Sequence, residues 1–173
     1  MPGMPAQGCE PSHSRCFWKA LMAETNQGEA GMSTADLVAR LSAILGSSEP
    51  EERRDGLWIS APQLDVEAMA REMKSLGYRL ITLTGCAQTD GETAVLYHYA
   101  RREQYVTFKT SSRGGALPSI TPILRMASWP EREIHDLFAL KFTGHPNLVP
   151  LLRPPGVKEG FFRDNEPTSA TQG

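Results

Sequence analysis

The chain has 173 residues, a formal net charge of −2 at pH 7 and 40% hydrophobic residues. This length suffices for one domain with a real core, and the near-neutral charge gives no sign of a nucleic acid or an acidic membrane surface as partner. We expect neither a membrane span nor a secretory signal, because no apolar run approaches roughly 20 residues. Three cysteines without a close pair indicate reduced thiols and a cytoplasmic location.

The first 31 residues are rich in Gly, Pro, Ser, Gln and Ala, a composition typical of segments that bury no core. The segment from Cys16 to Thr25 can form one or two helical turns within it. Periodic apolar residues begin only after Ser33. We therefore expect residues 1–31 to be a flexible N-terminal extension that is dispensable for folding.

The first regular element is a helix. Ser33 is a favourable N-cap, apolar residues recur at helical spacing over 37–45, and Gly46 ends the run. Residues 47–56 then form a charged loop, and residues 57–60 form a short apolar strand.

A second helix is predicted after Pro62, with Gly77 at its end. Residues 78–85 are rich in strand formers. Residues 93–100 alternate Val95, Tyr97 and Tyr99 with Leu96, His98 and Ala100, and residues 103–110 alternate again after a short link, which predicts a β-hairpin. A further extended piece is expected at 119–125.

The order of helix, strand, helix, several strands and helix predicts an α+β fold in two layers, with helices on one face of a mixed or antiparallel sheet. We divide the chain into the extension (1–31), an α+β domain (32–146) and an extended C-terminal docking tail (147–173).

A last helix is predicted from Ser128. Ser128 and Glu131 have the spacing of a capping box, and Pro130 falls in the first turn, where its missing N–H is tolerated. An apolar stripe follows at helical spacing, formed by Ile134, Leu137 and Phe138. The remaining positions are densely charged.

The charged positions of this helix predict ion pairs along it. Arg132 and Asp136 are four residues apart, as are Glu131 and His135, so each pair can meet on the helix surface. Such a helix could be an active site, a metal site or a docking surface.

Catalysis and metal binding have weaker support than docking. An independent small enzyme using Glu131, Glu133 and His135 stays an alternative, although the two glutamates are two apart and do not face each other. His135 and His145 are ten residues apart without an HExxH pattern, so we expect no metal and no cofactor in this chain. A free regulatory binding module is a further alternative.

A longer pattern extends around this helix. It consists of Ser119, Ile120, Trp129, Glu131, Arg132, Glu133, Asp136, Leu137, Phe138, Phe142, Gly144, His145, Pro146, Leu148, Arg163 and Asp164. In this order the residues resemble the C-type (30 kDa) subunit family of respiratory complex I, the NADH:quinone oxidoreductase, and the homologous small subunit of membrane-bound energy-converting nickel–iron hydrogenases. Ala139 stands where the family usually has Gly, and Asn147 where it usually has Asp. The short carboxyl end and the HDLF sequence favour the hydrogenase branch of the CO-induced type.

The resemblance implies a non-catalytic structural or assembly subunit of a membrane-associated complex for electron transport and proton translocation. Such a subunit lies in the cytoplasm, peripherally on the inner membrane face, against the large catalytic subunit. A small iron–sulfur subunit and, indirectly, the membrane module are further partners. Iron–sulfur clusters and nickel–iron, or FMN and quinone, are then expected in the partners. The C-type subunit of a respiratory NADH:quinone oxidoreductase is the alternative within the family.

The resemblance and the dense charge together indicate an interface, because aromatic residues and Arg are frequent interface hot spots. Trp129 and Phe138 are the expected anchors, and the charged residues are expected to pair at the junction with the large subunit. The predicted partner-binding residues are Trp129, Glu131, Arg132, Glu133, Asp136, Phe138, Phe142, Gly144, His145, Pro146, Arg163 and Asp164.

Overall fold

The structure is a computed structural model that describes residues 32–46, 48, 50–88, 91–112, 114–160 and 162. The chain divides into two units, Met1–Ser33 and Thr34–Gly173, and every element below belongs to the second unit. The expectations for residues 1–31, and for Arg163 and Asp164, lie outside the described residues.

The helices of the described part are α2 (Thr34–Leu45), α3 (Val66–Ser75), α4 (Ser128–Phe138) and the 3₁₀ turn η1 (Arg125–Ala127). The second helix begins at Val66, a few residues later than expected from Pro62. The reason is local: the Asp65 side chain caps it by accepting a 2.9 Å hydrogen bond from the backbone N–H of Ala68.

The main sheet has five strands: β1 (Pro50–Arg53), β2 (Gly56–Ser60), β3 (Arg79–Ala87), β4 (Thr93–Arg101) and β5 (Gln104–Ser111). Their spatial order is β1-β2-β5-β4-β3, with β2 parallel to β5 and the other neighbours antiparallel. The sheet is therefore mixed, and the β4–β5 hairpin is confirmed.

Two expectations about strands were wrong. The segment predicted to be a charged loop contains β1. All four residues of β1 are exposed, so the sequence shows no apolar alternation that would predict a strand. The piece expected to be extended at 119–125 consists instead of turns leading into η1. The extended residues come just before it, as β6 (Ala116–Pro118), which pairs in parallel with β7 (Lys141–Thr143).

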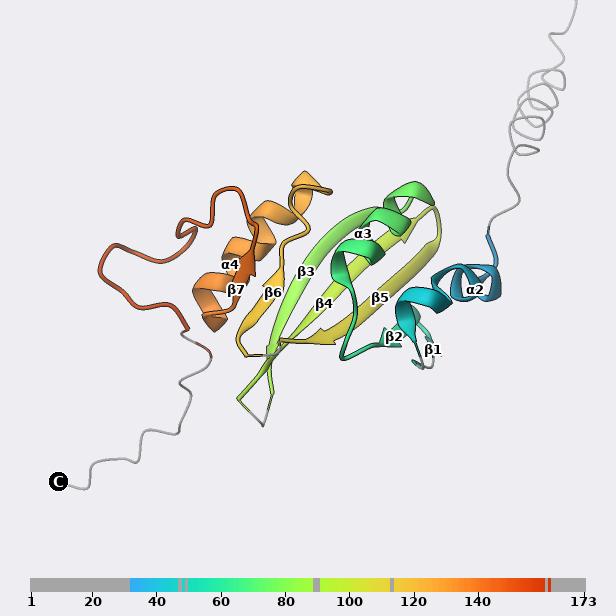
Figure 1. The fold of residues 1–173 in the computed structure, drawn as a ribbon, viewed down its shortest axis with the longest axis horizontal. Coiled ribbons are helices and arrows are strands. Elements are labelled where there is room, and N and C mark those ends of the chain that lie inside the picture. The colour runs from blue at the N-terminus through green and yellow to red at the C-terminus, as the bar shows by residue number, and fades with distance from the viewer. Residues whose placement is uncertain are drawn as a thin grey trace, which may run out of the picture. The chain divides into compact units, whose positions relative to one another are not determined.

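One face of the sheet carries the core. Tyr97, Tyr99 and Phe108 are fully buried there, whereas the opposite face exposes Tyr105 and Lys109. Figure 1 shows α3 lying across β4, and the contact of α4 with Gly85 places α4 on the buried face as well. The α+β prediction, with helices over one face of a mixed sheet, is confirmed.

Gly85 sets how closely α4 approaches the sheet. A Cβ atom at this position would lie 2.6 Å and 2.7 Å from the ring atoms Cε2 and Cδ2 of Phe138. Phe138 is itself buried. A side chain larger than hydrogen at residue 85 therefore pushes the helix away from β3.

We expect Gly85→Ala to lower the free energy of unfolding by about 1–3 kcal/mol, as overpacking of a filled core does. Urea denaturation of the full-length chain measures it. Cys86→Ala is the matched control, because Cys86 is the next residue of β3 and is exposed; its effect should stay within about 0.5 kcal/mol. Equal effects of the two substitutions would contradict the close helix–strand contact.

Candidate functional site

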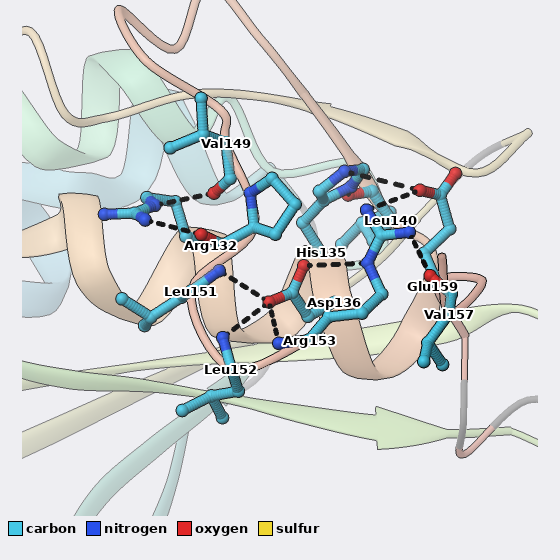
Figure 2. A network of polar contacts seen from close by, with 11 residues as sticks. Arg132, His135, Asp136, Leu140, Val149, Leu151, Leu152, Arg153, Val157 and Glu159 are labelled. Carbon is cyan, nitrogen blue, oxygen red and sulfur yellow. Dashed lines mark hydrogen bonds and ion pairs between the residues drawn. The ribbon is translucent and has the colours of Figure 1, made fainter. Parts of the chain in front are cut away.

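The outer side of α4 binds the chain that follows it. We call residues 147–160 the tail segment. The Arg132 guanidinium donates two hydrogen bonds to consecutive backbone carbonyls, from Nε to Val149 and from Nη2 to Pro150, each 2.8 Å long. Figure 2 shows this fork at one end of a longer network. Arg132 therefore fixes the backbone of the tail segment and does not pair along its own helix.

Asp136 is the centre of the same network. Its Oδ2 accepts hydrogen bonds from three successive backbone N–H groups, of Leu151 (2.7 Å), Leu152 (2.9 Å) and Arg153 (3.3 Å). The other oxygen, Oδ1, lies 3.6 Å from Nε of Arg153, and the backbone carbonyl of Asp136 accepts from Gly160 N–H at 2.8 Å. The tail segment thus wraps around one buried carboxylate, as Figure 2 shows.

The charge of Asp136 is well compensated. Burial alone would raise the pKa of Asp136, but the three N–H donors and the Arg153 guanidinium outweigh it and hold the pKa below its ordinary value. The ionised form is therefore the one that the tail segment recognises.

Arg153 and Glu159 close the far end of the network. Nη1 of Arg153 donates to the Val157 carbonyl at 2.6 Å, and Nη2 lies 3.5 Å from the Glu159 carboxylate. The same carboxylate is 3.8 Å from Nε2 of His135, whose Nδ1 contacts the Leu140 carbonyl at 3.0 Å. These contacts are seen side by side in Figure 2.

Glu131 lies on the inner side of α4 and is fully buried. Its Oε2 accepts hydrogen bonds from the hydroxyls of Ser119 (2.5 Å) and Thr121 (2.9 Å), and its Oε1 accepts from the backbone N–H of Ile120 at 2.8 Å. His145 Nε2 is 3.8 Å from Oε2, and the side chains of both partners are completely shielded from solvent. Glu131 thus joins α4 to the turns that follow β6 and β7.

Burial raises the pKa of the Glu131 carboxyl, and the donors from Ser119, Ile120 and Thr121 work in the opposite direction. Burial also lowers the pKa of the His145 imidazole, which the backbone of Ser128 partly opposes. Both shifts arise from the same cause, since desolvation penalises the charged form of each group.

The local expectations for this helix need correction. The pairs Arg132–Asp136 and Glu131–His135 do not form, because stronger partners from other segments take these side chains. The capping box is also absent: η1 runs directly into α4, Ser128 has helical backbone angles, and the helix has no side-chain cap.

The remaining predicted residues divide into buried and exposed sets. Phe138 and Phe142 are buried in the core, and the ring of Phe138 also packs against Phe162 at 5.7 Å between centroids. Glu133, Gly144 and Pro146 are exposed. Trp129 is 70% exposed, and Met126, which the sequence reasoning did not single out, is 71% exposed.

Ser119 and Thr121 are the functional contacts that the Glu131 prediction lacked. Ser119 was part of the family pattern, but it stands 12 residues before Glu131, beyond any spacing rule for a helix. The sequence pattern contained both Ser119 and Glu131 but gave no signal that their side chains meet.

The arrangement offers little for catalysis within the described part of the chain. Glu131 is enclosed, Glu133 is exposed, and His135 is occupied by Leu140 and Glu159, so the three do not converge. Among the described residues no group of three or more His, Cys, Asp or Glu side chains could hold a metal ion. None of the helices that the structure describes has the length and apolar character needed to cross a bilayer.

The fold and these contacts define a small α+β domain that uses its charged side chains to hold its own segments and leaves an aromatic helix face open. Residues 59–172 match the family described as "Respiratory-chain NADH dehydrogenase, 30 Kd subunit". The chain belongs to this family, as its sequence pattern predicted.

Curated relatives are bacterial proteins named as the C/D subunit of NADH-quinone oxidoreductase. The protein of Ectopseudomonas mendocina is 30% identical over 156 residues, covering 79% of this chain and 26% of the relative. That of Methylococcus capsulatus is 44% identical over 57 residues, covering 33% of this chain and 10% of the relative. The chain thus spans about a quarter or less of these relatives.

Two solved structures share the fold. A trypsin-resistant fragment of Nqo5 superposes with a TM-score of 0.55 at 23% identity, covering 66% of this chain and 98% of the fragment. A chain of an archaeal respiratory complex, the membrane-bound sulfane sulfur reductase, gives a TM-score of 0.54 at 20% identity, covering 70% of this chain and 78% of its own length.

Asp136→Asn preserves shape but removes the charge that three N–H groups recognise. We expect it to lower the free energy of unfolding by about 1.5–3 kcal/mol near pH 7. Because the pKa of Asp136 is lowered in the folded state, this stabilisation is complete above the unfolded-state value of about 3.9 and is lost as pH falls through the folded-state value.

Denaturation of the wild type and Asp136→Asn between pH 7 and pH 2.5 tests this: their difference should shrink at the acid end. Glu133→Gln, on the same helix but exposed, is the control and should change stability by less than about 0.5 kcal/mol at each pH. If the difference in free energy of unfolding between the wild type and Asp136→Asn stayed constant across this range, the charge of Asp136 would not be the source of the stabilisation.

Ala139 ends α4 in the left-handed region, at φ 53° and ψ 25°. This conformation is unfavourable for any residue with a Cβ atom, so Ala139→Gly should raise the free energy of unfolding by about 0.5–1 kcal/mol. Ala43→Gly, at an exposed position inside α2, should act in the opposite direction by about 1 kcal/mol. Thermal melting of both variants measures the two changes in stability. A loss of stability in Ala139→Gly would contradict the left-handed conformation of residue 139.

Proposed function

We propose that this chain is a non-catalytic subunit of a membrane-associated, complex I-like redox complex, in which it docks on the large catalytic subunit. The family match supports the role. The partner is suggested by the relatives, which are named as a joined C/D subunit. This domain matches only about a quarter of such a chain, so the rest of the chain is a candidate for the partner.

The observation that carries the docking proposal is the exposed face of η1 and α4. Met126 and Trp129 are three residues apart and are 71% and 70% exposed, and the exposed Glu133 follows one turn later. Residues at this spacing share one helix face. Large apolar side chains gathered on one face are typical of protein interfaces, and Trp is among the commonest hot-spot residues. We call Met126, Trp129 and Glu133 the docking face.

The buried charges of α4 have a supporting role in this proposal. Arg132 and Asp136 hold the tail segment on the helix, and the tail segment then presents Val149 (45% exposed) and Leu152 (59% exposed). The charged residues would thereby place two further apolar side chains for the partner instead of binding it themselves. A preformed tail loses less conformational entropy when a complex forms.

The redox cofactors in this proposal belong to the partner subunits. Iron–sulfur clusters would lie there with nickel–iron, or with FMN and quinone. The relatives are named as NADH-quinone oxidoreductase subunits, which supports a quinone-reducing complex. The hydrogenase branch would instead release H₂. Capture of the tagged chain from native membranes tests the proposal. We expect a larger subunit with metal clusters to be recovered, and assays for quinone reduction and H₂ evolution separate the two branches.

Trp129→Ala should weaken recovery of the large subunit by at least tenfold, because hot-spot truncations cost about 2 kcal/mol or more of binding free energy. The stability of the chain alone should change by less than about 0.5 kcal/mol, since Trp129 is exposed. Tyr105→Ala is the matched control, an exposed aromatic residue on the opposite face of the sheet (52% exposed). Undiminished recovery with Trp129→Ala would remove the docking face from the proposal.

A further inference from the structure

Glu131 and His145 form an enclosed acid–base pair where three segments meet. Glu131 comes from α4, its donors Ser119 and Thr121 follow β6, and His145 follows β7. The two side chains have no solvent exposure, and Oε2 and Nε2 are 3.8 Å apart. His145 lies at the entry to the tail segment.

The hydrogen bonds fix where the protons are. Nδ1 of His145 lies 3.0 Å from the backbone nitrogen of Asn147. A backbone N–H only donates, so Nδ1 is an acceptor and carries no proton. The proton of the neutral ring is therefore on Nε2, the nitrogen that lies 3.8 Å from Oε2 of Glu131. The three hydrogen bonds to Glu131 all come from donors, which fits an ionised carboxylate.

Other ionisable groups surround this pair. The hydroxyls of Tyr97 and Tyr99 on β4 are buried without a hydrogen-bond partner among the described residues, and burial together with the nearby Glu131 charge raises the pKa of both. From α4, Arg132 and His135 add to the effect of burial in lowering the pKa of His145. Burial and these two neighbours thus disfavour a positive charge on the ring while the chain is closed around it, although the Glu131 carboxylate 3.8 Å away favours one.

We propose that His145 is a pH-sensitive switch for the tail segment: a proton taken from solvent at Nδ1 breaks the bond to Asn147, opens the turn at residues 144–147 and loosens the tail segment from α4. No covalent bond other than the new N–H forms, and the ring charge changes from 0 to +1. The protonated Nδ1–H would otherwise point at the N–H of Asn147, two donors against each other.

The sign follows from linkage. The closed form has a His145 pKa below the ordinary value, and the open form has a pKa near about 6.5, so the closed form is fully favoured above pH 6.5 and is lost as pH falls below it. His135 also faces the tail segment, with its Nε2 3.8 Å from the Glu159 carboxylate. Glu131 acts in the opposite direction, because burial raises its pKa and its protonation in acid favours the closed form.

Hydrogen exchange of the full-length chain at pH 7.5 and pH 5.5, corrected for intrinsic exchange rates, tests the switch. The opening equilibrium of residues 147–160 should increase in the wild type by at most about tenfold, which is the limit for one proton taken up over one pH unit below 6.5. In His145→Asn it should not change, because the amide oxygen can still accept from Asn147 but cannot take up a proton.

Two histidine variants serve as controls. His98 lies on the exposed sheet face between the hydroxyls of Thr84 (3.2 Å) and Thr107 (3.0 Å), so His98→Asn should keep the wild-type response. His135→Asn should also keep a pH response, because Nδ1 of His145 and its bond to Asn147 remain. A pH response that persists in His145→Asn, or that is absent in the wild type, overturns the proposal.

Nitrogen NMR of the wild-type imidazole keeps the test independent of whether any variant folds. We expect the proton of His145 on Nε2 at pH 7.5 and a titration midpoint below that of a free histidine. A proton on Nδ1, or a midpoint at or above the ordinary value, overturns the proposal as well. Neither outcome depends on partner binding, so failure of the switch is distinguishable from failure of the docking proposal.

Discussion

The buried carboxylates of α4 are the constraint on which the rest of this domain depends. Removing a carboxylate from water costs several kcal/mol unless donors replace the lost hydration. Glu131 obtains three donors from residues 119–121, and Asp136 obtains three from residues 151–153. Two segments that have little regular structure are thereby fixed in position by one helix. The short β6–β7 pairing alone would be a weak tie between them.

This constraint also divides the helix into two functional sides. Glu131, Arg132 and Asp136 of α4 are turned toward the chain itself, and the exposed residues of η1 and α4 are Arg125, Met126, Trp129 and Glu133. An interface built around the two large apolar side chains avoids the desolvation of buried ion pairs. Most of the charge in the sequence of α4 therefore serves the fold of the chain itself, and the proposed docking face depends on Met126 and Trp129.

Much of the fold could be predicted because the signals are local. The apolar periodicity of α2 and α4 and the strand pattern of β4 and β5 lie within single elements, and the structure confirms these two helices and two strands. The prediction missed β1 for the same reason, because its four exposed residues show no alternation that a local rule could detect. Their pairing with β2 depends on the turn that follows. The members of the candidate site could be predicted only in part. The sequence pattern contained Ser119, Glu131 and His145, and local rules paired Glu131 with His135. The pattern lacked Thr121, Arg153 and Glu159. What brings the correct partners together is the parallel pairing of β6 with β7, whose strands are separated by the whole of α4. A contact across such a distance has no spacing signature, because helical and strand periods describe only neighbours within one element.

The parallel pairing of β6 with β7 also explains why a change at Glu131 or His145 would affect the position of the tail segment. Thr143 ends β7 and accepts the N–H of Ser119 at 2.8 Å, so the donors of Glu131 and the turn at His145 share one piece of backbone. The tail segment starts two residues after His145 and returns to the same helix at Arg132 and Asp136. Loosening the turn frees one end of a segment whose other anchor is a carboxylate on the opposite side of α4. The helix thus connects a solvent-shielded acid–base pair to the chain that would lie against a partner, without either group reaching the surface.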